Sequence, residues 1–582
     1  MKRVWSTNSF VPSFPKLSWI VGLVAIFVFA LLYAIVQLSS GMGVPFSVHD
    51  QPKILLHWWL LPYYAGRSLL RMFIAYAFSL LFTFLYGRLA ASYKLAEKIM
   101  IPLLDILQSV PVLGFLSITV TGFMNLFPHS LLGVELASIF AIFTGQVWNM
   151  TFSFYHSVSA LPQELREVSR IMKLDPFARF TRLELPYSMI GLVWNSMMSF
   201  GGGWFFLAAS ESITVLNHNI QLPGIGSYMA TAMQQGNIPA LIDAILTMII
   251  LIILVDQLLW RPIVAWSERF KMDLSGSDNA MNSWFLTFLR RSKLAQWLSE
   301  QIFGNLYRFI DGTMRRLTTP SPVRATTNTG LRKLIKSILL WLIGGVLTGA
   351  LLFYGAIGVR EIVKLGGANV LHVILLTLYT FFRVMTSTLL ALVWTIPVGV
   401  AIGLHPKASR IAQPIVQVVA SFPANMLFPL VALVFIRWHV NFQIGAIPLM
   451  MLGTQWYILF NVIAGAMSIP NDLKEATKML HLTGWERWKR LLLPSIFPYL
   501  VTGCITASGG AWNASIIAEL VAWKHTTLVA AGIGSFITQA TEKGQWPQII
   551  LSIVVMAAMV TLVNRVLWRP LYRLAETRYP IG

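Results

Sequence analysis

Residues 161–186 read LPQELREVSRIMKLDPFARFTRLELP, and residues 469–494 read IPNDLKEATKMLHLTGWERWKRLLLP. Both stretches begin with a charged, helix-forming segment and end in Leu-Pro. Identical residues recur 308 positions later, among them Pro162 as Pro470, Glu167 as Glu475, Leu185 as Leu493, and Pro186 as Pro494. A charged loop that occurs twice in one chain predicts two equivalent docking sites for a partner with two-fold symmetry.

The composition places most of this chain in lipid. Hydrophobic residues make up 56% and charged residues 12% of the 582 residues, and the mean hydropathy is +0.67. Soluble domains carry about 25% charged residues. The net charge of +21 is typical of membrane proteins, whose cytoplasmic loops are rich in lysine and arginine, and we expect no binding to nucleic acid. The one cysteine, Cys504, excludes a disulfide framework and a cysteine-based metal site.

Twelve segments are apolar and long enough to cross a membrane, which takes roughly 20 residues. Six lie in the first half, at residues 18–38, 66–92, 101–125, 132–155, 188–212 and 239–260. Six lie in the second half, at residues 335–357, 372–404, 411–436, 441–464, 495–520 and 547–568. We therefore predict an all-α polytopic membrane protein of two parallel six-helix repeats, with about 12 transmembrane helices.

Lysine and arginine indicate the orientation of these spans. They gather at the N-terminus, after the second span, in both repeated loops and in residues 261–336, which hold 13 of them against 5 acidic residues. By the positive-inside rule, we expect the N-terminus, the linker and the C-terminus in the cytoplasm. The apolar run 18–38 is long enough to remain as a span, so no cleavable signal is expected. The linker is either an amphipathic helix on the membrane surface or a basic tether.

The repeat extends far beyond the charged loop. Residues 145–262 align with 453–570 without a gap, and upstream the offset rises from 308 to 312, as between Arg71 and Arg383. We expect the four extra residues of the first half in the outer loop near 127–135. The predicted divisions are an N-terminal span and outer loop (1–64), a first repeat domain (65–262), a basic cytoplasmic linker (263–334), an extra span and outer loop (335–371), a second repeat domain (372–570) and a cytoplasmic tail (571–582).

The repeated loop resembles the EAA signature of the permease subunits of ATP-binding-cassette importers, written EAA-x3-G-x9-I-x-LP. Both loops keep its 19-step spacing, from Glu167 to Pro186 and from Glu475 to Pro494. Lys173 and His481 stand where the signature has glycine, which forms a sharp turn at positive φ at little cost. The alternative turn residues are Asp175-Pro176 and Gly484.

The resemblance implies that each loop forms a short coupling helix in a groove of a separate ATPase subunit. The coupling residues that it implies are Glu167, Arg170, Lys173, Leu185, Pro186, Glu475, Lys478, His481, Leu493 and Pro494. It implies two ATPase copies, which hold the ATP and magnesium, and no cofactor on this chain. It also implies a solute-binding protein that meets the outer face near 213–238 and 521–546.

The chain also carries an arginine early in each second span, Ser-x-Pro in each third span and Gly-x-Gly-Ser in each outer segment. In these features it is similar to the nitrate, sulfonate and taurine branch of these permeases, over residues 66–262 and 372–570. A type I importer fold in a bacterial or archaeal cytoplasmic membrane is then expected. The implied solute is an inorganic or organic oxyanion such as nitrate, sulfonate or bicarbonate. Because fused permeases for ferric iron and thiamine also occur, those solutes are the alternative.

Charged residues at equivalent positions are candidates for the path of the solute. Arg71 and Arg383 lie near the outer end of the second span in each half, and an arginine inside a membrane protein is usually functional. The alternative is that they extend to the membrane surface. Glu211 and Glu519 lie at the ends of the fifth spans. Because carboxylates repel an anion, we expect them to pair structurally, for instance with these arginines; if they line the path, a cationic or zwitterionic solute is favoured.

Two further features recur in both halves. Ser109-x-Pro111 and Ser421-x-Pro423 are expected to break the third span and free backbone groups inside the bundle, either as a gate or as a plain kink. The pairs Gly201-Gly202 and Gly509-Gly510 favour close helix packing over a solute contact.

The sequence holds no catalytic constellation. It has no Gly-x4-Gly-Lys-Ser/Thr phosphate loop, and its histidines lack metal-ligand spacing, so we expect a transport subunit without catalytic residues or metal ligands. Two rival classes remain. An ion-coupled secondary transporter needs ionisable residues at the bilayer midplane and no docking loop, and a membrane enzyme needs a cluster of reactive side chains at one face.

Overall fold

Helices account for nearly all of the folded chain, because a backbone in lipid must satisfy its own hydrogen bonds. The computed structural model describes residues 33, 35–46, 53–215, 218–270, 285–287, 349, 353, 355–524 and 526–578. The predicted spans 18–38 and 335–357 and the linker 263–334 lie mostly outside the described residues. The chain divides into two compact units. The first comprises Met1–Gln37, Ala160–Val193 and Val255–Thr327. The second comprises Leu38–Ser159, Trp194–Leu254 and Asn328–Gly582.

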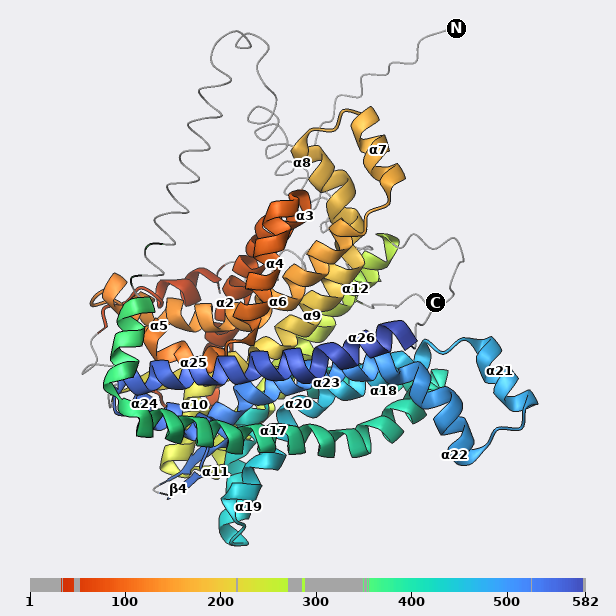
Figure 1. Cartoon of the computed structure of the whole chain (residues 1–582). Helices are drawn as coiled ribbons and strands as arrows, with labels where there is room; N and C mark the ends of the chain where they lie inside the picture. The colour runs from red at the N-terminus through yellow and green to blue at the C-terminus, as the bar shows by residue number, and fades with distance from the viewer. Residues whose placement is uncertain are drawn as a thin grey trace, which may run out of the picture. The chain divides into compact units, whose positions relative to one another are not determined.

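The first half of the chain (red to yellow-green in Figure 1) contains one run of helices and one hairpin. Its elements are η1 (Trp58–Leu60), α2 (Leu61–Phe82), η2 (Thr83–Gly87), α3 (Arg88–Ser92), α4 (Lys94–Ser109), η3 (Val112–Phe115), α5 (Leu116–Leu126), α6 (Leu132–Ser159), α7 (Gln163–Ile171), α8 (Pro176–Arg179), η4 (Phe180–Glu184), α9 (Leu185–Ser210), β1 (Ser212–Val215), β2 (His218–Gln221), α10 (Ile225–Gln235), α11 (Ile238–Val255), η5 (Asp256–Trp260), α12 (Arg261–Ser267) and η6 (Glu268–Phe270).

The second half (green to blue in Figure 1) repeats this order. Its elements are α17 (Gly366–Gly403), α18 (Pro406–Ser421), η9 (Ala424–Met426), α19 (Phe428–Arg437), α20 (Phe442–Met467), α21 (Asn471–Met479), α22 (Gly484–Arg487), η10 (Trp488–Leu492), α23 (Leu493–Ala518), β3 (Leu520–Trp523), β4 (Thr526–Val529), α24 (Ile533–Glu542), α25 (Trp546–Val563), η11 (Asn564–Trp568) and α26 (Arg569–Arg578).

Helices occupy each predicted span that falls on described residues. In that part of the chain, six helices are long and apolar enough to cross a membrane, or eight if two bent pairs count as one span each. The bent pairs lie at the predicted breaks: 82° separates the helices before and after Pro111, and 67° those around Pro423. Helices α6 and α9, of 28 and 26 residues, fill the predicted spans 132–155 and 188–212. The all-α, duplicated architecture is therefore confirmed.

The loop between α5 and α6, where we expect the four extra residues of the first half, covers residues 127–131, and the equivalent loop between α19 and α20 covers residues 438–441. The placement of the whole insertion in this loop stays a prediction, because the two loops differ in length by one residue. The first loop pairs with the chain ahead of the first repeat: the amide of Phe46 donates to the carbonyl of His129, and that of Leu131 to the carbonyl of Val44, both at 3.0 Å. These bonds fasten residues 44–46 to the loop.

Proline explains a second repeated feature, a short π-helical turn. Of the five π-helical turns among the described residues, four end two residues before a proline: η4, η5, η10 and η11, before Pro186, Pro262, Pro494 and Pro570. The fifth, η2, has no proline two residues after it. Proline has no N–H and its ring collides with the carbonyl four residues back, and the wider turn accommodates this without ending the helix. The Leu-Pro end of each repeated loop therefore continues directly into a long helix.

Two small antiparallel hairpins modify the all-α picture. Strands β1 and β2 pair Ser212 with Gln221, and β3 and β4 pair Leu520 with Val529 at the equivalent register. Each hairpin connects the fifth helix of its half to the next short helix. The sequence pattern of the outer segments did not predict them.

Candidate functional site

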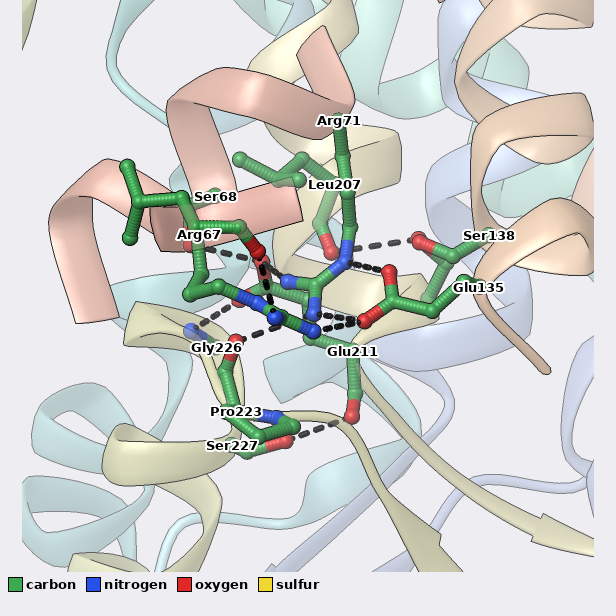
Figure 2. A network of polar contacts seen from close by, with 12 residues as sticks. Arg67, Ser68, Arg71, Glu135, Ser138, Leu207, Glu211, Pro223, Gly226 and Ser227 are labelled. Carbon is green, nitrogen blue, oxygen red and sulfur yellow. Dashed lines mark hydrogen bonds and ion pairs between the residues drawn. The ribbon is translucent and has the colours of Figure 1, made fainter. Parts of the chain in front are cut away.

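Arg71 is the centre of a fully buried ionic network in the first half (Figure 2). Its Nη1 donates to Glu211 Oε1 at 2.6 Å, and its Nε and Nη2 donate to the two oxygens of Glu135 at 2.5 and 2.8 Å. Arg67, one turn earlier on α2, also pairs with Glu135 and has no exposed side-chain surface. These residues form the first polar cluster, defined as Arg67, Arg71, Glu135 and Glu211. It holds two positive and two negative charges, so it is neutral.

Glu211 connects this cluster to the outer segment. Its Oε2 accepts the backbone N–H of Gly226 at 2.7 Å, and its carbonyl accepts the N–H of Leu222 at 2.8 Å. Ser68 bridges the same elements, since its hydroxyl donates to Glu211 at 2.6 Å and accepts the N–H of Ile225 at 3.0 Å. A Cβ at Gly224 would collide with the Glu211 carboxylate, so glycine is required there by close approach. Helices α2, α6, α9 and α10 are thereby joined at one point.

The second half builds a similar network around Arg383. Its Nη1 donates to Glu519 Oε1 at 2.8 Å, and its Nη2 donates to Gln443 Oε1 at 2.5 Å. Thr380 repeats the role of Ser68, because it donates to Glu519 at 2.7 Å and accepts the N–H of Ile533 at 2.9 Å. Glu519 Oε2 also accepts the N–H of Gly534 at 2.9 Å. These residues form the second polar cluster, defined as Thr380, Arg383, Gln443 and Glu519.

The two clusters differ by one matched exchange of charges. Gln443 stands at the position of Glu135, and Tyr379 stands at the position of Arg67. The second cluster therefore lacks one carboxylate and one guanidinium, and it is also neutral. Burying an unpaired charge is costly, so the two exchanges compensate each other.

The structure brings together four of the six residues predicted for the solute path. Arg71 pairs with Glu211, and Arg383 pairs with Glu519. The alternative in which the arginines extend to the membrane surface is wrong, because the exposed fraction of the Arg71 side chain is 0% and that of Arg383 is 9%. Ser421 lies elsewhere, with its hydroxyl against Gly201. For Ser109, at the end of α4, the structure describes the backbone.

Sequence reasoning missed Arg67, Glu135 and Gln443. Glu135 is the one acidic residue of the predicted span 132–155, and an acid in a span is itself a sign of a buried partner. Comparing the halves position by position would also have shown that Arg67 and Glu135 change together.

The repeated loops keep their sharp turn without glycine. Lys173 and His481 both adopt a φ of 49°, at the positions where the signature has glycine. The N–H of Leu174 donates to the carbonyl of Ser169 at 3.1 Å, and the N–H of Lys173 donates to the carbonyl of Arg170 at 3.0 Å. This pair of bonds is a Schellman C-cap. The same pair of bonds ends α21. The sharp turn after the first helix therefore lies at the signature's glycine position in both loops.

Glycine at these two positions should stabilise the turns. A left-handed conformation costs a non-glycine residue roughly 1 kcal/mol, so Lys173→Gly and His481→Gly should slow amide exchange of Leu174 and Leu482 about fivefold. Hydrogen exchange of the purified full chain measures this. Arg170→Gly and Lys478→Gly, which place glycine inside α7 and α21, are the matched controls and should speed exchange. Equal effects of both series would contradict the argument.

Each loop presents apolar side chains to solvent. In the first loop Ile171 and Met172 are 79% and 66% exposed, and in the second Met479 and Leu480 are 78% and 70% exposed. Trp485 is exposed as well. The charged residues predicted for coupling lie on the same helices, and Glu167, Arg170, Glu475 and Lys478 are exposed. Leu185 and Leu493 begin the long helices α9 and α23. An exposed apolar face flanked by charges indicates a protein-docking surface.

Within the described residues, no group of three or more histidine, cysteine, aspartate or glutamate side chains is arranged to hold a metal ion.

The model of the family described as "Binding-protein-dependent transport system inner membrane component" matches residues 83–259 and 395–578, which are more than half of the chain. The two matches fall on the two halves of the repeat.

Several curated proteins are similar to about a third of the chain. The bicarbonate transport system permease protein of Synechocystis sp. is 32% identical over 189 residues, which are 32% of this chain and 64% of that protein. The nitrate import permease protein of Leptolyngbya laminosa is 29% identical over 31% of this chain and 62% of its own length. The taurine transport system permease protein of Escherichia coli is 25% identical over the same shares. This chain spans less than two thirds of the length of these relatives.

Proposed function

The chain belongs to the family of binding-protein-dependent transport system inner membrane components, and from this premise we propose that it is a two-half permease of an ATP-driven importer. The family is that of a multi-pass transport subunit of the inner membrane. Two family domains in one polypeptide support the view that this chain replaces a dimer of permease subunits. The predicted domain boundaries remain a proposal.

The proposed solute is a small oxyanion such as bicarbonate, nitrate or a sulfonate. The relatives above are named for bicarbonate, nitrate and taurine, and ferric iron or thiamine is not favoured by them. We assign the two polar clusters a structural role. Their guanidinium groups are already bonded to carboxylates and amide oxygens, so an entering anion would have to break a neutral buried network.

The exposed faces of α7 and α21 are the proposed docking sites for two copies of an ATPase, which would hold ATP and magnesium. A solute-binding protein would deliver the solute to the outer face, near residues 213–238 and 521–546, which overlap the two hairpins. The N-terminus, the linker and the C-terminus would then be cytoplasmic. The observation that carries this assignment is the pair of loops with the same turn, the same exposed apolar face and the same continuation into a long helix.

Affinity purification of the tagged chain in mild detergent tests this function. We expect a nucleotide-binding subunit at two copies per chain, identified by mass spectrometry, and ATPase activity in the eluate. The double variant Glu167→Ala and Glu475→Ala should lose both, because these exposed carboxylates lie on the docking helices. A chain that purifies alone, with no ATPase activity, would favour the ion-coupled secondary transporter instead.

A further inference from the structure

Tyr457 of α20 lies between equivalent residues of the two halves. A Cβ at Gly202 of α9 would be 3.2 Å from the Tyr457 hydroxyl, and a Cβ at Gly510 of α23 would be 3.6 Å from Cε2 of the same ring. Gly202 and Gly510 are 308 residues apart and occupy the same position in their repeats. One tyrosine ring therefore contacts both members of an equivalent pair.

This double contact locates the ring relative to the symmetry of the fold. Parallel repeats are related by an axis along the membrane normal, and equivalent residues lie on opposite sides of it. A group within about 4 Å of both members of such a pair must lie near their midpoint, which is on the axis. In two-half transporters the solute passes between the repeats, so the Tyr457 ring lies where the pathway must run.

The two halves of the repeat carry different residues at the position of Tyr457. The counterpart of Tyr457 is Asn149, whose side chain is exposed. Only one bulky group can occupy a point on a two-fold axis, so a second tyrosine at residue 149 would compete for the same space. The glycines, in contrast, are present in both halves, because both helices must approach the ring. A Cβ at Gly510 would lie 3.2 Å from Cγ2 of Thr454, so this glycine serves helix packing as well as the approach to the ring, whereas a Cβ at Gly202 would meet the Tyr457 hydroxyl.

We propose that Tyr457 is the side chain that closes the solute pathway on its axis, and that Gly202 and Gly510 form its seat. The inference rests on the proposed function for the existence of a pathway. Closure comes from the size of the ring. A small oxyanion passes when movement of the two halves separates the glycines and releases the ring from between them.

Passive nitrate release from proteoliposomes tests closure without any ATPase. Vesicles that contain the purified full chain are loaded with nitrate, and its efflux is followed with a nitrate-selective electrode. We expect Tyr457→Ala to release nitrate at least tenfold faster than the unmodified chain. Tyr457→Phe should be as tight as the unmodified chain, because it keeps the ring. Asn149→Ala, at the equivalent position, is the matched control and should also be tight.

A second set of variants distinguishes a specific contact with the Tyr457 ring from a general packing defect. Gly202→Ala places a methyl group 3.2 Å from the Tyr457 hydroxyl, so we expect uptake to fall several-fold, and Tyr457→Phe in the same chain should restore it by removing that oxygen. The methyl group of Gly510→Ala would meet Thr454 Cγ2 at 3.2 Å and the ring edge at 3.6 Å, neither of which Tyr457→Phe changes, so Tyr457→Phe should not restore uptake there. The proposal is overturned if Tyr457→Ala stays tight, or if Tyr457→Phe or Asn149→Ala leaks equally. The efflux assay uses no ATP, so it tests the role of Tyr457 separately from the proposed function. A leak in Tyr457→Ala, together with no ATP-driven uptake by the unmodified chain, would reject the importer assignment but support closure of the pathway by Tyr457.

Discussion

Replacing Glu135 with glutamine is expected to lower the free energy of unfolding by about 3–5 kcal/mol, the usual loss when one partner of a buried ion pair is removed. Arg67 would then lose its carboxylate partner, and Arg71 would keep Glu211 alone, in a site with no exposed side-chain surface. The position keeps its size and much of its hydrogen bonding, so the loss would come from charge. The thermal midpoint of the purified chain in detergent measures it.

A second substitution should recover much of this loss. Arg67→Tyr added to Glu135→Gln removes the surplus positive charge and reproduces the residues of the second half, Tyr379 and Gln443. Recovery should stop short of complete, because Arg67 also donates to the carbonyl of Leu38 at 2.7 Å, which tyrosine cannot replace. Arg67→Tyr alone should destabilise, since it leaves one arginine against two carboxylates.

The control for this cycle lies in the second polar cluster. Gln443→Glu adds a carboxylate beside Arg383 without a second guanidinium, and it should destabilise the chain as an unpaired buried charge does. Additive effects of Arg67→Tyr and Glu135→Gln, with no coupling between them, would refute the idea that the clusters are balanced as units.

The sequence was sufficient for features that repeat, and insufficient for contacts that depend on how helices pack. The duplicated loops, the breaks at Pro111 and Pro423 and the four-residue insertion all follow from comparing the chain with itself. The ion pair between Arg71 and Glu135 depends on the rotation of α2 against α6. An apolar pattern does not specify this rotation, because both helices are apolar on most faces.

Local propensity misjudged two smaller elements. Glycine is the usual residue at the positions of Lys173 and His481, but the cost of roughly 1 kcal/mol for another residue is offset by the two hydrogen bonds of the C-cap in each loop. The hairpins β1–β2 and β3–β4 have strands of four residues, too short for a clear alternation of polar and apolar residues. In both cases the surrounding structure decided the outcome.

Charging the exposed apolar face of one coupling loop is expected to remove one ATPase copy from the complex. Ile171→Lys with Met172→Lys alters the first loop, and Met479→Lys with Leu480→Lys alters the second. Burying side chains of this size contributes about 1.5–3 kcal/mol each, so two of them account for at least a 100-fold change in affinity even after other costs of association. The fold should be unaffected, because all four side chains are mostly exposed.

The stoichiometry of the purified complex distinguishes equivalent docking sites from a single dominant one. With equivalent sites, either double variant should reduce the ATPase from two copies per chain to one, and the fourfold variant should remove both and abolish ATP-driven uptake. Lys524→Gln, an exposed change after β3, is the control and should keep two copies. Two copies retained in the fourfold variant would show that the apolar faces of α7 and α21 do not bind the ATPase. Loss of both copies from one altered loop would mean that the two ATPase subunits bind only as a pair, so that the two-fold symmetry of the partner, and not each loop alone, sets the affinity.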